Sequence, residues 1–187
     1  MRGHEYIREA IRTYLESAVP VRLTAHLAAN GLTSPNVADL RFLLADGLQE
    51  ITDFPAVIVR STDATDDTHT GGDTWQIVYD LEVIVACDHR IHGDAEGASK
   101  DRDRVLLAVR EAVYFAAGLT DDIDIFPAKR AEQTGAADET RAGVPLAAGR
   151  LKFRAAVLET LVDLDPPETI TAVDQSVDGY SADQTLP

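Results

Sequence analysis

The densest group of chemically versatile side chains lies between residues 87 and 94, where Cys87, Asp88, His89, His92 and Asp94 follow one another closely. Thiolate, imidazole and carboxylate are the groups that zinc prefers, and ligands spaced this closely in a loop can converge on one ion. A structural zinc site, however, takes four ligands, usually as two separated pairs, and no second pair follows in the sequence. We therefore predict no metal site, a Cys87 that acts as a small hydrophobic side chain, and an Asp94 that caps a helix.

Asp80 and Glu82 are a second candidate, because they lie two residues apart on the polar face of a predicted strand. A pair of carboxylates can perform general acid–base chemistry, but the sequence offers no nucleophile or partner to go with them. The sequence also lacks a GxxxxGK[ST] phosphate loop, a GxGxxG turn after a strand and a GxSxG nucleophile motif. We predict no catalytic residue, no bound cofactor and no enzymatic activity.

Charge is distributed unevenly along the chain. The 187 residues include 17 Lys and Arg against 32 Asp and Glu, a net charge of −15. Residues 61–99 carry nine acidic groups and one basic group, and residues 165–187 carry five acidic groups and no basic one. A surplus of this kind disfavours general binding to nucleic-acid phosphates. Residues 63–69 lack the alternating oxygen ligands and central glycine of an EF-hand loop, so we interpret them as a solvated hairpin tip.

Three basic side chains, Arg150, Lys152 and Arg154, alternate along one face of a predicted strand. One interpretation is an ordinary solvated strand face. The other interpretation is an electrostatic contact with an acidic surface, such as residues 61–99 of a second copy. Under this second interpretation we predict that the stripe lies at a subunit interface. Reversing all three charges should then weaken assembly more than the monomer fold. The acidic residues predicted to line such an interface, or a central lumen, are Asp63, Asp66, Asp67, Asp73, Asp80 and Glu82.

The elements that must position these side chains include two amphipathic helices. The first covers residues 5–18, and we predict that Pro20 ends it. Residues 21–51 are less regular and are interpreted as one or two short helices, with Asn36 as a candidate N-cap. The second helix covers residues 94–117, with Gly118 in the position of a C-terminal cap. Its predicted buried stripe consists of Val105, Leu106, Val109, Ala112, Val113 and Ala116.

The clearest strand covers residues 74–87, in which side chains alternate strictly between two faces. We expect it to form an antiparallel hairpin with residues 56–60, so that the polar residues 61–73 form the loop at the tip. The apolar face consists of Trp75, Ile77, Tyr79, Leu81, Val83, Val85 and Cys87. Both apolar stripes need a partner, so we predict that this strand packs on the second helix, with Trp75, Tyr79 and Leu81 contacting Val105, Val109 and Val113.

The remaining sequence predicts a strand at a sheet edge over residues 123–126, a long Gly/Ala/Pro loop over 133–149 and a last strand over 150–164. Leu151, Phe153, Ala155 and Val157 should face inward on that last strand. Together these elements predict an α+β fold, with a mostly antiparallel sheet of about four strands, a long central hairpin and two or more helices.

We expect one domain over residues 1–164, with 20–53 as a helical or loop insertion. Residues 165–187 should form a flexible acidic tail, or one ordered only against a neighbouring chain. No apolar run approaches the roughly 18 residues of a membrane span, and Met1 precedes charged residues, so we expect no membrane association. The single cysteine excludes an internal disulfide and fits a reducing compartment.

The order of elements resembles the tail terminator, or tail completion, proteins of long-tailed bacteriophages. The segments that carry the resemblance are the strand from Trp75 to Val85, the helix from Arg102 to Val113 and the strand from Leu151 to Glu159. The resemblance covers about residues 4–164. It implies a structural virion protein that forms a ring, in that family a hexamer, on the end of the tail tube.

A ring of this family stops tube growth and presents an attachment surface to the head. The implied partners are further copies of the chain, the tail tube protein and a head connector or neck protein. DNA would pass through without specific binding, which an acidic lumen favours because like charges repel. The implied location is the head-proximal end of the virion tail, after assembly in the host cytoplasm. The alternatives are another head–tail neck subunit, an unassigned binding module, or a metal-dependent hydrolase that uses His89 and His92.

Overall fold

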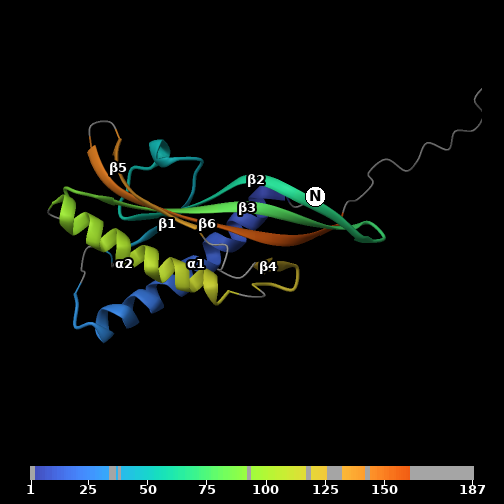
Figure 1. Cartoon of the computed structure of the whole chain (residues 1–187), viewed down its shortest axis with the longest axis horizontal. Coiled ribbons are helices and arrows are strands. Elements are labelled where there is room, and N and C mark those ends of the chain that lie inside the picture. The colour runs from blue at the N-terminus through green and yellow to red at the C-terminus, as the bar shows by residue number, and fades with distance from the viewer. Residues whose placement is uncertain are drawn as a thin grey trace, which may run out of the picture.

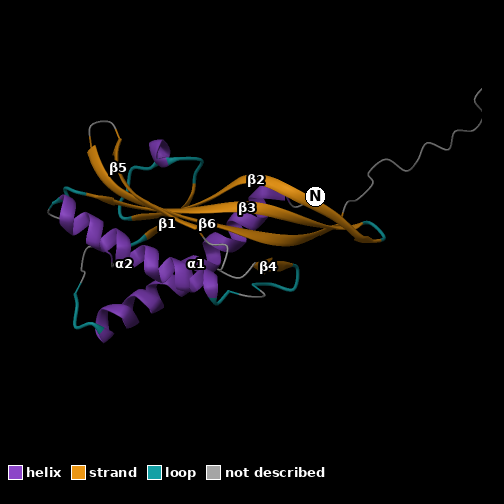
Figure 2. Cartoon of the chain, in the orientation of Figure 1, coloured by secondary structure: helices purple, strands orange, loops and turns teal. Residues whose placement is uncertain are grey.

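The computed structural model describes residues 3–33, 37, 39–91, 94–116, 119–125, 132–141 and 144–160. A single curved sheet is covered on one face by two helices (Figure 1), and the long strands run the length of the molecule (Figure 2). In chain order the elements are α1 (Gly3–Ala29), β1 (Arg41–Leu44), the 3-10 turn η2 (Leu48–Glu50), β2 (Ala56–Gly71), β3 (Thr74–Asp88), α2 (Ala95–Tyr114), β4 (Ile123–Ile125), β5 (Glu132–Arg141) and β6 (Val144–Thr160). The predicted α+β class is confirmed.

The sheet has six strands in the order β1-β2-β3-β6-β4, and β5 also pairs with β6. The strand β1 runs parallel to β2, and the other pairs are antiparallel. The predicted hairpin of β2 and β3 is therefore present, and β6 lies on the other side of β3. The pairing of β3 with β6 extends from Thr74↔Thr160 to Asp88↔Leu146. Six strands exceed the expected four because β1 and β5 were not recognised as strands.

The helix α2 packs on the sheet through the predicted stripe, all six residues of which are buried. Tyr79 and Leu81 of β3 belong to the same core cluster as Val105, Val109 and Val113, as predicted. Trp75 was wrongly assigned to this contact: it is only half-buried, and its ring lies 5.0 Å from that of His69. The α2 helix ends at Tyr114 with Phe115 as its C-cap, ahead of Gly118, which lies outside the described residues.

The first helix does not end at Pro20, as predicted, but continues to Ala29 with Pro20 inside it. A proline in a helix interior removes one backbone hydrogen bond and costs about 3 kcal/mol. Val19 and Leu23 offset this loss, because they extend the buried stripe of α1 at the same four-residue spacing. The buried residues of that stripe are Ile7, Ile11, Leu15, Val19 and Leu23.

Residues 40–51 form no α-helix, in contrast to the prediction. Arg41–Leu44 is the strand β1, paired in parallel with Ala56–Val59, and the short turn η2 follows it. The connection carries Ala45, Leu48 and Ile51 onto the sheet face opposite the helices, where they form a second core cluster with Ile58 and Ile84. The predicted N-cap Asn36 lies outside the described residues.

The acidic residues 61–73 are not a loop, as predicted, but mostly strand, because β2 continues to Gly71. Three register shifts accompany this polar half of the β2–β3 pairing. Only residues 72 and 73 form the turn, where Gly72 has φ +59°, a left-handed conformation that favours glycine. The apolar alternation expected of a buried strand is absent here, since both faces of this half are exposed or partly exposed.

The Gly/Ala/Pro segment 133–149 is likewise not a loop: β5 pairs antiparallel with the first half of β6, which begins at Val144. The edge strand β4 and the inward-facing residues of β6 are as predicted. At Gly149 an added Cβ would lie 3.0 Å from Leu106 Cδ2, so the glycine permits the close approach of α2 to β6. Residues 161–187, which include the predicted tail, lie outside the described part of the chain.

Candidate assembly surface

The predicted basic stripe and the predicted acids Asp80 and Glu82 lie on the sheet face opposite the helices. The strand register places Arg154 across from Asp80 and Lys152 across from Glu82, with Arg150 two residues along on the same face. Arg60 of β2 pairs in register with Glu82 from the other side. We call the set Arg60, Asp80, Glu82, Arg150 and Arg154 the charge ladder. Antiparallel pairing thus brings the predicted basic stripe and two of the predicted acids together within one chain.

Glu82 lies at the centre of the charge ladder and is 1% exposed. Its carboxylate forms a short ion pair with Arg60, and Arg150 Nη1 lies 4.0 Å from Oε1. Arg60 Nη1 also donates a hydrogen bond of 2.8 Å to the Asp46 carbonyl oxygen, which fixes the guanidinium over the sheet. The prediction that Glu82 lies on an open acidic face is therefore wrong: the side chain is buried beneath its basic partners.

Asp80 and Arg154 form the outer step of the charge ladder, with Arg154 Nε 3.4 Å from Asp80 Oδ1. Lys152 is the exposed member of the predicted basic stripe. Opposite charges directly across a strand pair stabilise it by a fraction of 1 kcal/mol when exposed, and removing one partner of a buried pair is costly because the other charge is left uncompensated. The charge ladder therefore contributes first to the stability of a single chain. Lys152, which lies outside the ladder, is the residue of the basic stripe best placed to meet another surface.

The second half of the β2–β3 hairpin forms a projecting arm. We define the arm as Ser61–Thr70 of β2, residues 71–73 with the turn, and the paired part of β3, and Figure 1 shows it extending past the ends of both helices. Asp63, Asp67 and Asp73 are exposed on it, whereas the side chain of Asp66 is outside the description. The strand β1 pairs only with Ala56–Val59, so no described strand pairs with the outer edge of β2 along the arm.

The base of the arm is fixed to the first turn of α1. His4 Nδ1 lies 2.7 Å from Ser61 Oγ, and the His4 ring lies edge-on to Tyr79 with centroids 4.9 Å apart. Tyr79 Oη donates a hydrogen bond of 2.5 Å to the buried Glu159 Oε1, which also accepts one of 3.1 Å from the Gly3 backbone nitrogen. Burial, and then the Glu159 carboxylate, raise the pKa of Tyr79 well above its usual range.

The sequence interpretation missed this contact at Glu159. The available signal was a carboxylate at an inward-facing position, because Glu159 continues the alternation of the apolar residues Ala155 and Val157. A buried carboxylate needs donors. The side chain of Tyr79 and the start of α1 supply them, so this contact holds the arm, β6 and the N-terminal helix in a fixed arrangement.

Two residues of the His/Cys segment, Cys87 and Asp94, have structural roles in the fold. Cys87 is buried beside Ala98 and Ala147, and burial raises its pKa to about 12. Asp94 caps α2, as predicted, by accepting a hydrogen bond of 2.6 Å from the Gly97 nitrogen. Among the described residues, which omit His92, no three His, Cys, Asp or Glu side chains converge as metal ligands do.

No protein-family model matches this chain, and no curated protein has a significantly similar sequence. Neither α1 nor α2, nor any other described helix, is long and apolar enough to cross a membrane. A function for this chain is therefore inferred from its fold and from the arm.

Proposed function

We propose that this protein is a structural subunit of a bacteriophage tail that assembles into a ring on the end of the tail tube. The single observation that carries the proposal is the arm, with its long outer edge of β2. Along Ser61–Thr70 the backbone amides and carbonyls of that edge face no described strand. Such an edge is a template for pairing with another chain, and proteins usually shorten or cover it unless it has a use.

An arm of this kind suits repeated association of identical copies. In the proposed association, a copy that binds the edge of β2 does so through a different patch of its own surface. Heterologous contacts of this type generate a ring when the rotation between copies closes. The proposed ring is a homo-oligomer, and the resemblance to phage tail terminator proteins implies six copies. Its further partners are the tail tube protein and a head connector.

The exposed acids of the arm fit a ring through which DNA passes. Asp63, Asp67 and Asp73 give the arm a negative surface without basic neighbours on the same segment. Like charge keeps a polyanion away from a wall, and it also discourages indiscriminate pairing of the free edge. A head–tail neck subunit is the alternative, since it would use the same arm but bind the connector in preference to the tube.

The proposal is tested by the mass of the assembled protein and by its effect on tail tubes. Native mass spectrometry should give a ring of six copies, for the isolated chain or for the chain recovered from tube ends. Adding the protein to polymerising tail tube protein should shorten the tubes seen by electron microscopy. A wild type that stays monomeric and leaves tube length unchanged would contradict the proposal, and binding to connectors alone would favour the neck subunit.

The role of the arm is tested separately with a bulky label. Cys87 is buried, so a cysteine introduced at the exposed Thr68 can be modified selectively with a maleimide-linked polyethylene glycol. The labelled Thr68→Cys protein should fold normally and fail to form rings. The matched control is Ala28→Cys, which is exposed near the end of α1 on the other side of the fold and should assemble after labelling.

A further inference from the structure

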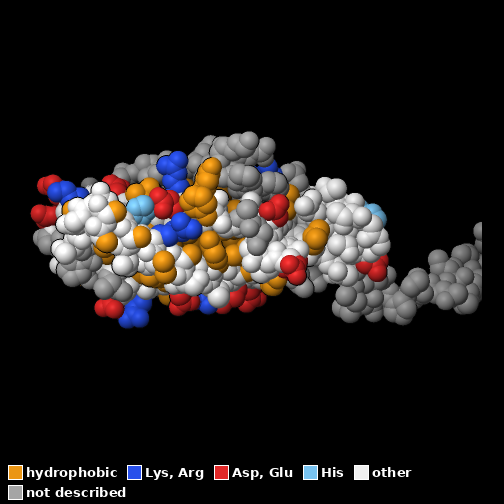
Figure 3. All heavy atoms as spheres, turned by 90° about the horizontal axis from the view of Figure 1, so that it is seen from below, with side chains coloured by type: hydrophobic (Ala, Val, Ile, Leu, Met, Phe, Trp, Pro, Cys, Tyr) orange, Lys and Arg blue, Asp and Glu red, His pale blue; other side chains and the backbone are white. Residues whose placement is uncertain are grey.

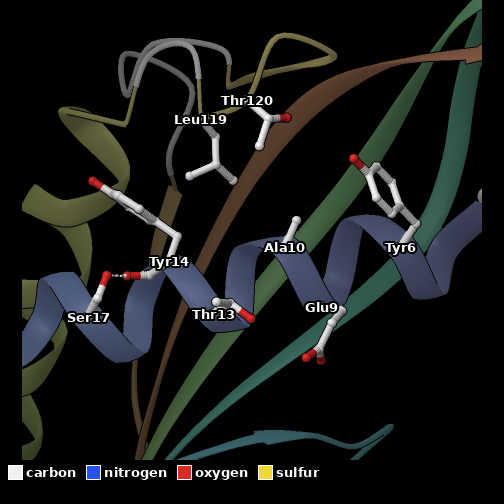
Figure 4. Close-up of a pocket in the computed structure, with 8 residues that line it drawn as sticks. All are labelled: Tyr6, Glu9, Ala10, Thr13, Tyr14, Ser17, Leu119 and Thr120. Carbon is white, nitrogen blue, oxygen red and sulfur yellow. Dashed lines mark hydrogen bonds between the residues drawn. The ribbon is translucent and has the colours of Figure 1, made fainter.

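An apolar groove lies along α1, on the side that faces residues 119 and 120. It encloses about 550 Å³ and is lined by Tyr6, Glu9, Ala10, Thr13, Tyr14, Ser17, Leu119 and Thr120. Figure 4 shows Tyr6, Ala10 and Tyr14 projecting from the helix toward the segment that carries Leu119, with Thr13 and Glu9 at the outer rim. Ala10 has a small side chain, so the groove is deepest at this position, between the rings of Tyr6 and Tyr14.

Both tyrosine walls are held in place by their hydroxyl groups. Tyr6 Oη donates a hydrogen bond of 2.8 Å to Asp122 Oδ2, and Tyr14 Oη donates one of 3.0 Å to the Ala112 carbonyl oxygen. The polar ends of the two side chains are thereby satisfied within the fold, while their rings border the groove. A groove with fixed walls loses little conformational entropy on binding a partner.

The groove has an acidic end. Thr120 also lines a neighbouring hollow of about 210 Å³, together with Asp121, Asp122 and Asp124. An apolar groove that shares Thr120 with a hollow lined by three aspartates is complementary to an aromatic side chain followed by a cation. The groove is large enough for more than one aromatic ring, since sites for small organic ligands begin near 300 Å³.

This chain itself displays such a combination on the helix side of the molecule. Phe115 is 63% exposed and Tyr114 is 54% exposed, with their ring centroids 5.0 Å apart in an edge-on arrangement. The guanidinium carbon of Arg22 lies 5.0 Å from the centroid of Phe115, which adds a cation to the pair. We call Arg22, Tyr114 and Phe115 the aromatic knob. Figure 3 shows hydrophobic side chains gathered on this face.

We propose that the groove of one copy receives the aromatic knob of a second copy, with Arg22 directed toward the aspartates beyond Thr120. The inference rests on the proposed function, because it requires copies that associate. Arg22 lies 3.9 Å from Glu111 of its own chain and remains partly exposed, so it adds a cation beside the exposed aromatic pair that complements the nearby aspartates. In the proposed arrangement two neighbouring copies form one knob–groove contact, not two reciprocal ones, so the contact is heterologous and can repeat around a ring.

The test uses one variant for each side of the contact. Phe115→Ser removes an exposed side chain and should leave the fold intact, while Ala10→Trp fills the floor of the groove. Thr13→Arg is a second groove variant at an exposed rim position, which covers the case in which Ala10→Trp fails to fold. Each should weaken self-association by about tenfold or more, as expected for a central aromatic anchor. The control Ile91→Ser, 47% exposed beyond the other end of α2, should assemble like the wild type.

Mixing the variants tests the pairing directly. Phe115→Ser keeps an intact groove and the groove variant keeps an intact knob, so an equimolar mixture retains one good contact and should stop at a dimer by native mass spectrometry. Wild-type assembly by both single variants, or a mixture without dimers, would overturn the inference while leaving the proposed function standing. Binding of a small amphipathic probe in the groove without any effect on assembly would also overturn it. A wild type that never assembles contradicts the proposed function itself.

Discussion

Arg154 lies directly across the sheet from Asp80 of the same chain, with its Nε 3.4 Å from Asp80 Oδ1. From the sequence, the basic stripe and the acids were expected to meet across a subunit boundary, but the antiparallel register pairs them within one subunit. The charge ladder therefore carries no surplus of negative charge, whereas residues 61–73 of the arm contain four aspartates and no Lys or Arg. This changes what a charge-reversal experiment reports.

Reversing Arg150, Lys152 and Arg154 to Glu should destabilise the monomer itself, because two of the new carboxylates would lie beside Asp80 and the buried Glu82. Arg60→Ala isolates the effect: it removes the closest partner of Glu82 and should cost about 3 kcal/mol of unfolding free energy. Urea unfolding checks both variants. Lys152→Ala is the matched control and should change stability by less than about 0.5 kcal/mol. Equal stability of Arg60→Ala and the wild type would show that the ladder contributes nothing.

Val109→Asp should lower the unfolding free energy by about 3 kcal/mol or more, because it places an unpaired charge between α2 and the sheet. Val109 is 0% exposed in the core cluster. Leu107→Asp, two residues earlier on the same helix and 45% exposed, should have a much smaller effect. Thermal melts of the two variants check the comparison, and similar melting temperatures would mean that α2 is oriented differently.

Cys87 should react with thiol reagents only after unfolding. Burial, and then the negative charge of Asp101, raise its pKa to about 12, so the native thiol stays protonated at pH 8. The unfolded thiol ionises near pH 8.5, so the unfolded state loses its proton first. The stability that the protonated, buried Cys87 thiol contributes to the folded state is therefore complete below about pH 8.5, and it declines as the pH rises toward 12. Ellman's reagent at pH 8, with and without guanidinium, provides the measurement, and fast reaction of the native protein would contradict the burial.

Deleting residues 167–187 should leave the melting temperature of the monomer within about 2 °C of the wild type. The deleted segment is acidic, contains few apolar residues and lies beyond the last described strand, β6. Differential scanning calorimetry of the two chains makes the comparison. A decrease of many degrees would show that the segment belongs to the core, and a loss confined to assembly would show that it contacts a neighbouring chain.

The sequence alone determined the helices and strands in which buried residues recur at one regular spacing. The alternation in β3 and the helical stripe of α2 each specify one apolar face, and two such faces in one chain must cover each other. The Asp94 cap, the inward residues of β6 and the α+β class were predictable for the same reason. In each case the spacing of apolar residues within one segment is enough to choose its secondary structure, because the other secondary structure would expose part of the apolar face to water.

Only the tertiary structure decided the segments in which buried residues do not recur at a regular spacing. The polar half of β2 is a strand because β3 offers it backbone partners, and α1 continues past Pro20 because Val19 and Leu23 find a buried site. The ion pair of Glu82 with Arg60, and the contact of Glu159 with Tyr79, depend on register between strands far apart in sequence. Residue spacing fixes which face a side chain takes, but only strand pairing fixes which charge lies opposite it.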